Sequence, residues 1–246
     1  MPLGDGRSCR CDPALELARP RRRLRVQDEH GDIGHRRSLL SGRQTLARDV
    51  RAYVGLGANL GNPTWTVAGG IGAIAALPGV RLRGVSRLYS TEPVGVLDQP
   101  EFRNAVVALD APIGGDPTTA ALALLVALKQ LEHAFGRRDR ERWGPRELDL
   151  DLLIFGRHRI AVERPPEASS ADPAKPTDLV VPHRLAGERL FVLAPLADLA
   201  PGLIPPGWHE TVDSARRRRE RIEGPDAVRP IATWDAERSA WTPPSS

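Results

Sequence analysis

The sequence of 246 residues is poor in several residue types, and each scarcity excludes a class of protein. Its only cysteines are Cys9 and Cys11, too few for a disulfide framework or a four-cysteine zinc site. Aromatic residues make up 4%, so the core must be built from Leu, Val, Ile and Ala. No apolar run approaches the roughly 20 residues of a membrane span, and the N-terminus lacks the continuous apolar segment of a secretory signal. We therefore expect a cytoplasmic protein with no membrane partner.

Lysine is also scarce, because Lys129 and Lys175 are the only two, and arginine supplies nearly all the positive charge. The formal net charge of +4 lies in residues 1–50, which hold eleven Arg against seven Asp or Glu. The rest of the chain carries equal numbers of basic and acidic residues. A neutral folded part disfavours nucleic-acid binding, and we expect no such partner. Arginine, by contrast, suits planar, bidentate recognition of phosphate.

Three regions of the chain differ in composition. Residues 1–50 show no sustained helical or strand period, which predicts a disordered or loosely ordered basic extension. Residues 51–205 have the periodic apolar pattern of a folded domain, except for a Pro-, Ser- and Ala-rich stretch near 164–178 that predicts a flexible insertion. Residues 206–246 are rich in Pro, Arg and Glu, which predicts a solvated charged helix and then a frayed tail.

The periodic region predicts elements in the order β-α-β-β-α-β. Both helices begin with a capping side chain followed by proline, a typical helix start. This order predicts an α+β fold of the ferredoxin-like kind, in which helices pack on an antiparallel sheet, with C-terminal additions. The expected strands are 52–57, 80–89, 102–110 and 147–155, the expected helices are 63–77 and 117–135, and the additions are a hairpin at 157–162 and a helix at 189–199.

The stretch from Arg142 to Phe155 carries the densest set of chemically active side chains. Its second half alternates as a strand does, with aliphatic residues on one face and acidic residues on the other. The expected aliphatic face holds Leu148, Leu150, Leu152 and Ile154, and the expected opposite face holds Glu147, Asp149, Asp151, Leu153 and Phe155.

Asp149 and Asp151 are expected side by side on that opposite face. Carboxylate oxygens at this spacing suit Mg²⁺, which proteins usually hold with one or two carboxylates plus substrate phosphates. Carboxylates for a metal beside guanidinium groups for phosphate are typical of phosphoryl transfer. Two solvated aspartates beside a surface ion-pair cluster are the alternative. The arginines that precede or adjoin the pair are Arg137, Arg138, Arg140, Arg142 and Arg146.

The glycines Gly55, Gly57 and Gly61 follow an apolar strand, as they do in dinucleotide-binding proteins. Their spacing is one residue off that fingerprint, and no acidic residue follows a second strand about 20 residues on. A dinucleotide site is therefore disfavoured. A P-loop kinase is excluded, because the chain contains no G-x-x-x-x-G-K-[ST] motif.

Four blocks of the sequence, in order, resemble the 6-hydroxymethyl-7,8-dihydropterin pyrophosphokinase family. The resemblance covers roughly residues 52–205 and implies the same ferredoxin-like fold. It also implies transfer of a diphosphoryl group from ATP to the hydroxymethyl oxygen of the pterin, with release of AMP, in folate biosynthesis. The blocks are G-L-G-A-N-L-G from Gly55, Y-S-T-E-P-V-G with D-Q-P-E-F-R-N from Tyr89, R-W-G-P-R-E-L-D-L-D-L-L from Arg142, and V-P-H through R-L-F-V-L-A-P-L from Val181.

The resemblance implies a role for each matching residue. Two Mg²⁺ ions would be held by Asp149 and Asp151, which form the catalytic set together with Arg137 and Arg146. Asp139 stands where a basic residue is common, which leaves open whether Arg138 or Arg140 contacts phosphate. The implied ATP-binding residues are Arg137, Arg138, Trp143, Arg146, His183 and Arg189, and the implied pterin-binding residues are Thr91, Val94, Gly95, Phe102, Asn104 and Phe191.

Two other functions compete with this one. A different Mg²⁺-dependent phosphotransferase on the same scaffold would keep both aspartates but need no pterin pocket, so Phe102, Asn104 and Phe191 favour the pterin enzyme. A nucleic-acid-binding module would need exposed sheet aromatics and a basic face, which the sequence lacks. We expect a monomer whose substrates are ATP and 6-hydroxymethyl-7,8-dihydropterin.

Overall fold

The computed structural model describes residues 49–93, 98–137, 145–169 and 177–243. The chain divides into two units, Met1–Arg43 and Gln44–Ser246, and all described residues belong to the second unit. Apart from its last two residues, the extension expected at 1–50 lies outside the described residues, and its loose order stays a prediction.

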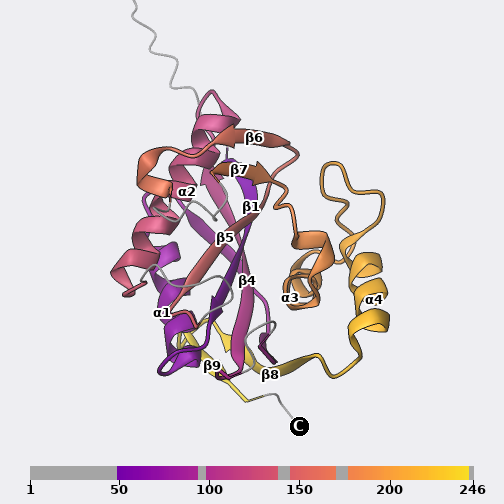
Figure 1. The fold of residues 1–246 in the computed structure, drawn as a ribbon. Coiled ribbons are helices and arrows are strands. Elements are labelled where there is room, and N and C mark those ends of the chain that lie inside the picture. The colour runs from indigo at the N-terminus through magenta and orange to yellow at the C-terminus, as the bar shows by residue number, and fades with distance from the viewer. Residues whose placement is uncertain (1–48, 94–97, 138–144, 170–176, 244–246) are drawn as a thin grey trace, which may run out of the picture. The chain divides into compact units, whose positions relative to one another are not determined.

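An antiparallel sheet of seven strands forms the centre of the second unit (Figure 1). Its strands lie in the order β5-β1-β4-β3-β8-β9, and β2 also pairs with β4. Strands β6 and β7 form a separate two-stranded sheet. The strands are β1 (Asp49–Ala58), β2 (Arg81–Val85), β3 (Leu88–Thr91), β4 (Phe102–Pro112), β5 (Asp149–Phe155), β6 (Ile160–Glu163), β7 (Asp178–Val181), β8 (Val228–Asp235) and β9 (Ala240–Thr242).

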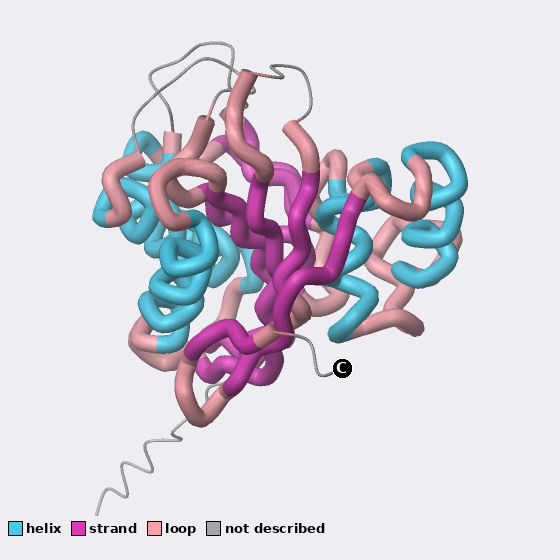
Figure 2. The backbone as a smooth tube through the Cα atoms, turned by 90° about the horizontal axis from the view of Figure 1, so that it is seen from below, coloured by secondary structure: helices cyan, strands magenta, loops and turns pink. Residues whose placement is uncertain are grey.

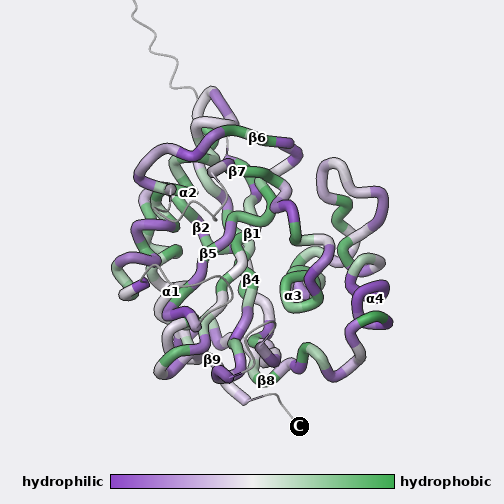
Figure 3. Tube along the Cα trace, in the orientation of Figure 1, coloured by the Kyte–Doolittle hydropathy of each residue, from purple (hydrophilic) through white to green (hydrophobic). Residues whose placement is uncertain are grey.

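Helices cover both faces of the sheet, as Figure 2 shows from below. Helices α1 and α2 pack on one face, α3 packs on the other, and α4 packs against α3. Figure 3 shows the contrast between the apolar α3 and the largely hydrophilic α4. The helices are α1 (Pro63–Ala75), α2 (Pro117–Ala134), α3 (Leu190–Leu199) and α4 (Val212–Glu223), and short 3₁₀ turns span Pro166–Ala168 and Ala186–Glu188.

Successive side chains of β1 point to opposite faces of the sheet, so this strand contributes to two hydrophobic cores. Ala52, Val54 and Leu56 point into the cluster that α1 and α2 cover, whereas Tyr53 points into the cluster that α3 and α4 cover. Apolar side chains on both faces are removed from water, which is the main stabilising contribution to folding. The ferredoxin-like α+β sandwich is thus confirmed, with α3, α4, β8 and β9 added to it.

The two predicted helix starts are also confirmed. The Asn62 side chain accepts a hydrogen bond from the backbone N–H of Trp65. The Asp116 carboxylate accepts from the N–H groups of Thr118 and Thr119. Each cap satisfies N–H groups that have no partner within the helix.

The single strand expected at 80–89 is wrong, because the chain forms two strands there, β2 and β3. The interruption falls at Ser86, which is 1% exposed. Its N–H donates to the carbonyl of Val106, and its Oγ accepts from the N–H of Val106. The hydroxyl thus replaces a backbone partner, so β4 stays satisfied where the two short strands meet.

A bulge in β5 overturns part of the predicted face assignment. Tyr53 pairs with Ile154 but Val54 pairs with Leu152, so Leu153 is an extra residue. Ile154 consequently joins the α3 side, and Phe155 turns into the core on the α1 and α2 side. The predicted faces hold for Asp149 to Leu153 and are reversed for the last two residues of the strand.

Two predictions for the C-terminal half also need correction. The stretch expected to form a hairpin on the main sheet instead contributes β6, which pairs with β7. The insertion expected near 164–178 begins with a 3₁₀ turn whose Ala168 is buried in the main core, so its start is not loose. Residues 170–176 lie outside the described residues.

The frayed tail expected after the charged helix is also wrong, because residues 228–242 form the hairpin of β8 and β9. The solvated charged helix before it is confirmed as α4, whose arginines pair with acids one turn away or nearby. Within the described ranges, no helix combines the length and the apolar character that a membrane crossing requires.

Candidate active site

The aspartate pair lies on the sheet face that α3 only partly covers. Asp149 is opposite Gly57 and Asp151 is opposite Gly55 in the β1–β5 pairing. Both aspartates alternate with Leu150, which points into the opposite core. The structure therefore brings the two carboxylates to one face of one strand, as predicted.

The strand between the two aspartates is held by side chains from α2. The Glu132 carboxylate accepts from the backbone N–H of Leu150 at 2.6 Å. The Lys129 ammonium donates to the carbonyl oxygen of Leu150 at 2.9 Å and to Glu132 at 2.6 Å. Because β5 pairs only with β1 in the main sheet, these contacts take the place of a neighbouring strand. They fix the backbone from which Asp149 and Asp151 project.

Two guanidinium groups hold the Asp149 carboxylate. Arg137 Nη1 donates to Asp149 Oδ1 at 2.5 Å, and Arg146 Nη1 donates to Oδ2. Burial alone would raise the pKa of Asp149, but the charges of Arg146, Arg137 and Lys129 outweigh burial and hold its pKa well below the ordinary value. Asp149 is consequently ionised at neutral pH.

Arg137 also binds Glu132, with Nη1 2.5 Å from Oε2. Glu132 is 2% exposed, and burial raises the pKa of its carboxyl, with Lys129 opposing that effect and Asp149 adding to it. Burial lowers the pKa of Arg137, but Asp149 and Glu132 outweigh it and raise the pKa above the ordinary value. Arg137 is thus a fixed cation, anchored on one side by α2 and on the other by β5.

A polar pair lies two strands away from the aspartates, on the same face. Asn104 is opposite Gly57 on β4, about 9–10 Å from the β5 backbone at the usual strand spacing. Its Nδ2 donates to Thr91 Oγ1 at 2.8 Å, and it is 7% exposed. A Cβ on Gly57 would lie 3.1 Å from Asn104 Oδ1. Because glycine has no side chain, the sheet surface between Asn104 and Asp149 stays uncovered at this position.

The two phenylalanines predicted to stack on the pterin flank this polar pair. Phe102 is opposite Thr91 in the β3–β4 pairing. Phe191 packs against the cluster of Tyr89, Leu190, Ala194 and Val228 on the same face. Both rings are half-buried, so each keeps some surface for contact. The guanidinium carbon of Arg189 lies 5.6 Å from the centre of the Phe191 ring, a cation–π contact.

His183 lies beside the bulge in β5. Its backbone N–H donates to the carbonyl oxygen of Leu153 at 2.8 Å, which ties the Pro182-His183 loop to the aspartate strand. Its side chain is half-buried. Leu153, the extra residue of the bulge, therefore anchors the loop that carries His183 through its carbonyl oxygen.

Four predicted site residues are Val94, Gly95, Arg138 and Trp143, and they lie outside the described residues. The ten that are described fall into three groups. The residues around the aspartates are Arg137, Arg146, Asp149 and Asp151; those around the polar pair are Thr91, Phe102, Asn104 and Phe191; and His183 and Arg189 come from the segment that leads into α3.

The sequence prediction missed Lys129, Glu132 and Asn59. Glu132 could have been found, because it lies four residues after Leu128 on the buried stripe of α2, and a charged residue on such a stripe needs partners. Asn59 is 1% exposed and bonds to the backbone of Arg146 and Pro100. No periodicity marks Asn59, since both partners are far away in the chain.

Arg164 was also missed. Its Nε donates to the carbonyl oxygen of Asp178 at 3.0 Å. Burial lowers its pKa, and the charge of Asp151 opposes that effect. Arg164 is therefore a cation whose pKa the charge of Asp151 affects, whereas Arg137 and Arg146 contact Asp149 directly.

An antiparallel α+β sandwich that gathers carboxylates and guanidinium groups on one sheet face has the side chains that suit a phosphotransferase. The family model of 7,8-dihydro-6-hydroxymethylpterin-pyrophosphokinase matches residues 53–201. The chain belongs to this family.

Individual relatives agree. A 2-amino-4-hydroxy-6-hydroxymethyldihydropteridine pyrophosphokinase of Pseudomonas aeruginosa is 43% identical over 160 residues, 65% of this chain and 86% of the relative. One from Methylorubrum extorquens is 39% identical over 166 residues, 68% of this chain and 91% of the relative. A crystal structure of a Plasmodium falciparum HPPK-DHPS mutant shares the fold, with a TM-score of 0.59 and 14% identity over 81% of this chain. The present chain spans 50% of that longer one.

The chain is thus an ATP-dependent pyrophosphokinase of folate synthesis, with ATP as its co-substrate. The predicted family and activity are confirmed.

Proposed function

We propose that the face between β5 and β3 carries the reaction, with ATP phosphates at the aspartate end and the pterin at the Asn104 end. In this reaction a diphosphoryl group passes from ATP to the hydroxymethyl oxygen of 6-hydroxymethyl-7,8-dihydropterin, and AMP leaves. The observation that carries the proposal is the row Asp149–Gly57–Asn104, which sets a charged cluster and a polar pair on one face with no side chain between them.

Asp149 and Asp151 fit a Mg²⁺ site that substrate completes. Among the described residues, no group of three His, Cys, Asp or Glu side chains could hold a metal. Two carboxylates on one face supply the protein's usual share for Mg²⁺, and phosphate oxygens and water would supply the rest. Bound there, two Mg²⁺ ions would neutralise phosphate charge and favour ionisation of the attacking hydroxyl.

Arg146 and Arg137 have different tasks in this account. Both Asp149 oxygens accept from a guanidinium, and although each keeps a further lone pair, two cations already face the carboxylate, so we infer that one arginine gives way when a metal ion binds. Arg137 is also held by Glu132 and is 18% exposed, whereas Arg146 is 33% exposed. We assign the exchange to Arg146, which moves from Asp149 to a phosphate oxygen, while Arg137 stays and stabilises the charge that develops during transfer.

The pterin end is assigned to residues that suit a flat ring with donors and acceptors at its edge. Phe102 and Phe191 offer apolar ring faces, and Asn104 with Thr91 offers polar atoms on the same face of the sheet. His183 and Arg189 belong to the phosphate side in this assignment, as predicted from the family resemblance. Water must be kept from the phosphates, because hydrolysis competes with transfer.

The test combines a product assay with two arginine variants. Wild-type protein with ATP, Mg²⁺ and the pterin should form AMP, and only when the pterin is present. Arg146→Gln should lower kcat/KM for ATP by at least about 100-fold, the size expected for loss of one charge-stabilising donor. The matched control is Arg83→Gln, whose arginine pairs with Asp110 at 2.7 Å in an exposed cluster. Formation of ADP in place of AMP would contradict the proposal. A kcat/KM for ATP in Arg146→Gln equal to that of wild type would contradict it as well.

A further inference from the structure

The last two strands of the main sheet come from a part of the chain that follows the family match. That match ends at residue 201, whereas β8 begins at Val228. Strand β8 pairs antiparallel with β3, so that Thr91 is opposite Val228 and Ser90 is opposite Arg229. Strand β3 in turn pairs with β4. Strand β8 is therefore only two strands from Phe102.

One row of this pairing faces the proposed pterin site. It runs from Val228 through Thr91 to Phe102. Val228 is 9% exposed and packs in the cluster that also contacts Phe191. A residue of the C-terminal hairpin thus packs in the cluster that contacts Phe191 and lies in the same cross-strand row as Phe102.

The neighbouring row, on the other face, is polar and converges on Glu101. Arg229 Nη2 donates to Glu101 Oε1 at 2.6 Å, and Ser90 Oγ donates to Oε2. Arg103 Nη1 donates to Glu101 Oε2 at 3.1 Å and to Ser90 Oγ at 2.5 Å. The hydrogen bond from Ser90, with those from Arg229 and Arg103, outweighs burial and lowers the pKa of Glu101, so the carboxylate is charged at neutral pH.

We propose that β8 forms part of the pterin site. In this proposal Arg229 is a positioning residue that keeps Phe102 in place through its ion pair with Glu101. Glu101 immediately precedes Phe102, so fixing the carboxylate also limits where the ring can point. The inference rests on the proposed pterin role of Phe102 and Phe191. The aspartate end lies across β1 and β4, and its contacts with Arg137, Arg146 and Glu132 involve no residue of β8.

The closing experiment is a comparison of three arginine variants in the full chain. Arg229→Gln should raise KM for the pterin about three- to fivefold, since a partly exposed pair contributes up to ~1 kcal/mol and 1.4 kcal/mol is tenfold. KM for ATP and kcat should stay within about twofold. Arg229→Lys should give an intermediate rise. The matched control, Arg238→Gln, should change neither KM.

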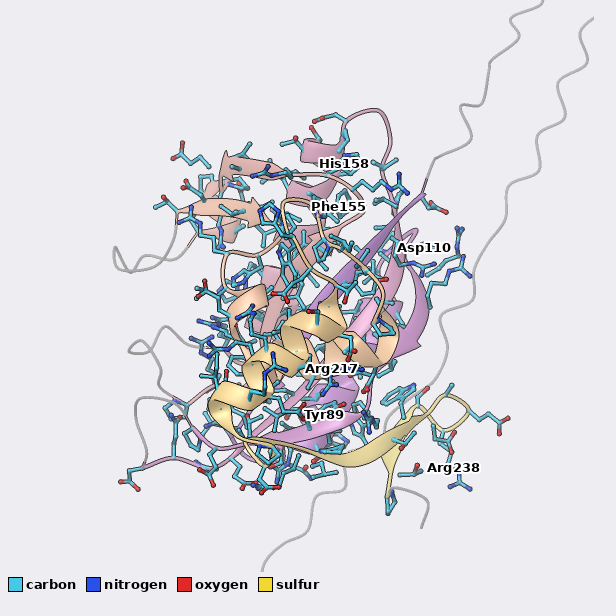
Figure 4. All side chains as sticks on the ribbon, turned by 90° about the vertical axis from the view of Figure 1, so that its right-hand side faces the viewer. Tyr89, Asp110, Phe155, His158, Arg217 and Arg238 are labelled. Atoms are coloured by element: carbon cyan, nitrogen blue, oxygen red, sulfur yellow. The ribbon has the colours of Figure 1, made fainter. Side chains whose placement is uncertain are left out.

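Arg238 is a suitable control because it lies in the same hairpin but away from the site. Its side chain is 75% exposed and is 3.5 Å from Asp235. Figure 4 shows it in the turn between β8 and β9, well separated from Tyr89. If Arg229→Gln does not fold, Arg229→Lys carries the test, because a pterin KM equal to wild type in that variant would overturn the proposal.

A double variant separates positioning from general damage. Glu101→Gln combined with Arg229→Gln should raise pterin KM no further than Glu101→Gln alone, because Arg229 acts only through the carboxylate that Glu101→Gln removes. Additive effects, or an equal rise in KM for ATP, would overturn the role of Arg229. Failure of the underlying assignment is distinguishable: Phe102→Ala with an unchanged pterin KM would refute the pterin site itself. A raised pterin KM in Phe102→Ala with none in Arg229→Gln would refute only the present inference.

Discussion

Asn59 and Arg146 exchange two hydrogen bonds although they are 87 residues apart in the chain. The Asn59 N–H donates to the carbonyl oxygen of Arg146 at 3.0 Å, and the Arg146 N–H donates to Asn59 Oδ1 at 2.7 Å. The Asn59 amide also donates to Gln99 Oε1 at 3.0 Å and to the carbonyl oxygen of Pro100 at 3.1 Å. One buried amide therefore joins the segment before Asp149 to the segment before Phe102.

Asn59→Ala should impair both ends of the site at once. It removes a hydrogen bond to the Arg146 backbone and two to the Gln99–Pro100 segment, and should lower the free energy of unfolding by about 1–3 kcal/mol. We expect KM to rise for ATP and for the pterin alike, measured by steady-state AMP formation. Asn62→Ala is the matched control: it loses the α1 cap, at about 0.5–2 kcal/mol, but neither KM should change. Equal kinetics in the two variants would refute the coupling.

Replacement of Glu132 tests the contacts by which Glu132 and Lys129 hold the backbone of β5 at Leu150. Glu132→Leu leaves Lys129 and Arg137 without their shared carboxylate at 13% and 18% exposure, and should lower the free energy of unfolding by about 3–5 kcal/mol. Urea denaturation measures this loss. A more exposed pair provides the comparison: Glu210 precedes α4 and pairs with Arg218 of that helix, so Glu210→Gln removes the acidic partner of Arg218 and should cost about 1 kcal/mol or less. A similar cost for both variants would mean that these contacts are not a buried network.

The pH dependence of stability should reveal the lowered pKa of Asp149 in the folded protein. Its folded-state pKa is lowered, so the ionised form favours folding; this contribution is full above the unfolded pKa of about 3.9 and is lost as pH falls towards the folded pKa. Asp149→Asn removes it. The difference in unfolding free energy between wild type and Asp149→Asn should therefore be constant above about pH 5 and shrink below about pH 4. A difference that stayed constant down to pH 3 would show that Asp149 is not held as described.

Much of the fold could be predicted because its signals are local. A cap followed by proline marks the starts of α1 and α2, and the spacing of apolar residues marks the strands that meet in the sheet. The bulge at Leu153 could not be predicted, since it exists only in the pairing with β1. Strand β8 was missed as well, because Pro230 argues against a strand in this short stretch, which becomes one only where β3 offers it an edge.

The candidate site divides in the same way. The Asp149–Leu150–Asp151 alternation places the carboxylates from sequence alone, whereas Glu132 and Asn59 act through contacts that tertiary packing creates. The domain boundaries, the monomeric state, the absence of nucleic-acid and membrane partners, and the cytoplasmic location stay predictions.

The most direct measurement is turnover by Asp151→Ala at saturating ATP, Mg²⁺ and pterin, with pterin affinity measured separately by titration. Loss of a metal-binding carboxylate should lower the rate of AMP formation by at least about 10³-fold, since bound metal contributes several kcal/mol to the transition state. Pterin affinity should stay within about threefold, because Phe102, Asn104 and Phe191 are untouched. Asp178→Ala, whose carboxylate pairs with the exposed Arg184 at 3.1 Å, should turn over normally. Near-normal turnover by Asp151→Ala would contradict the account.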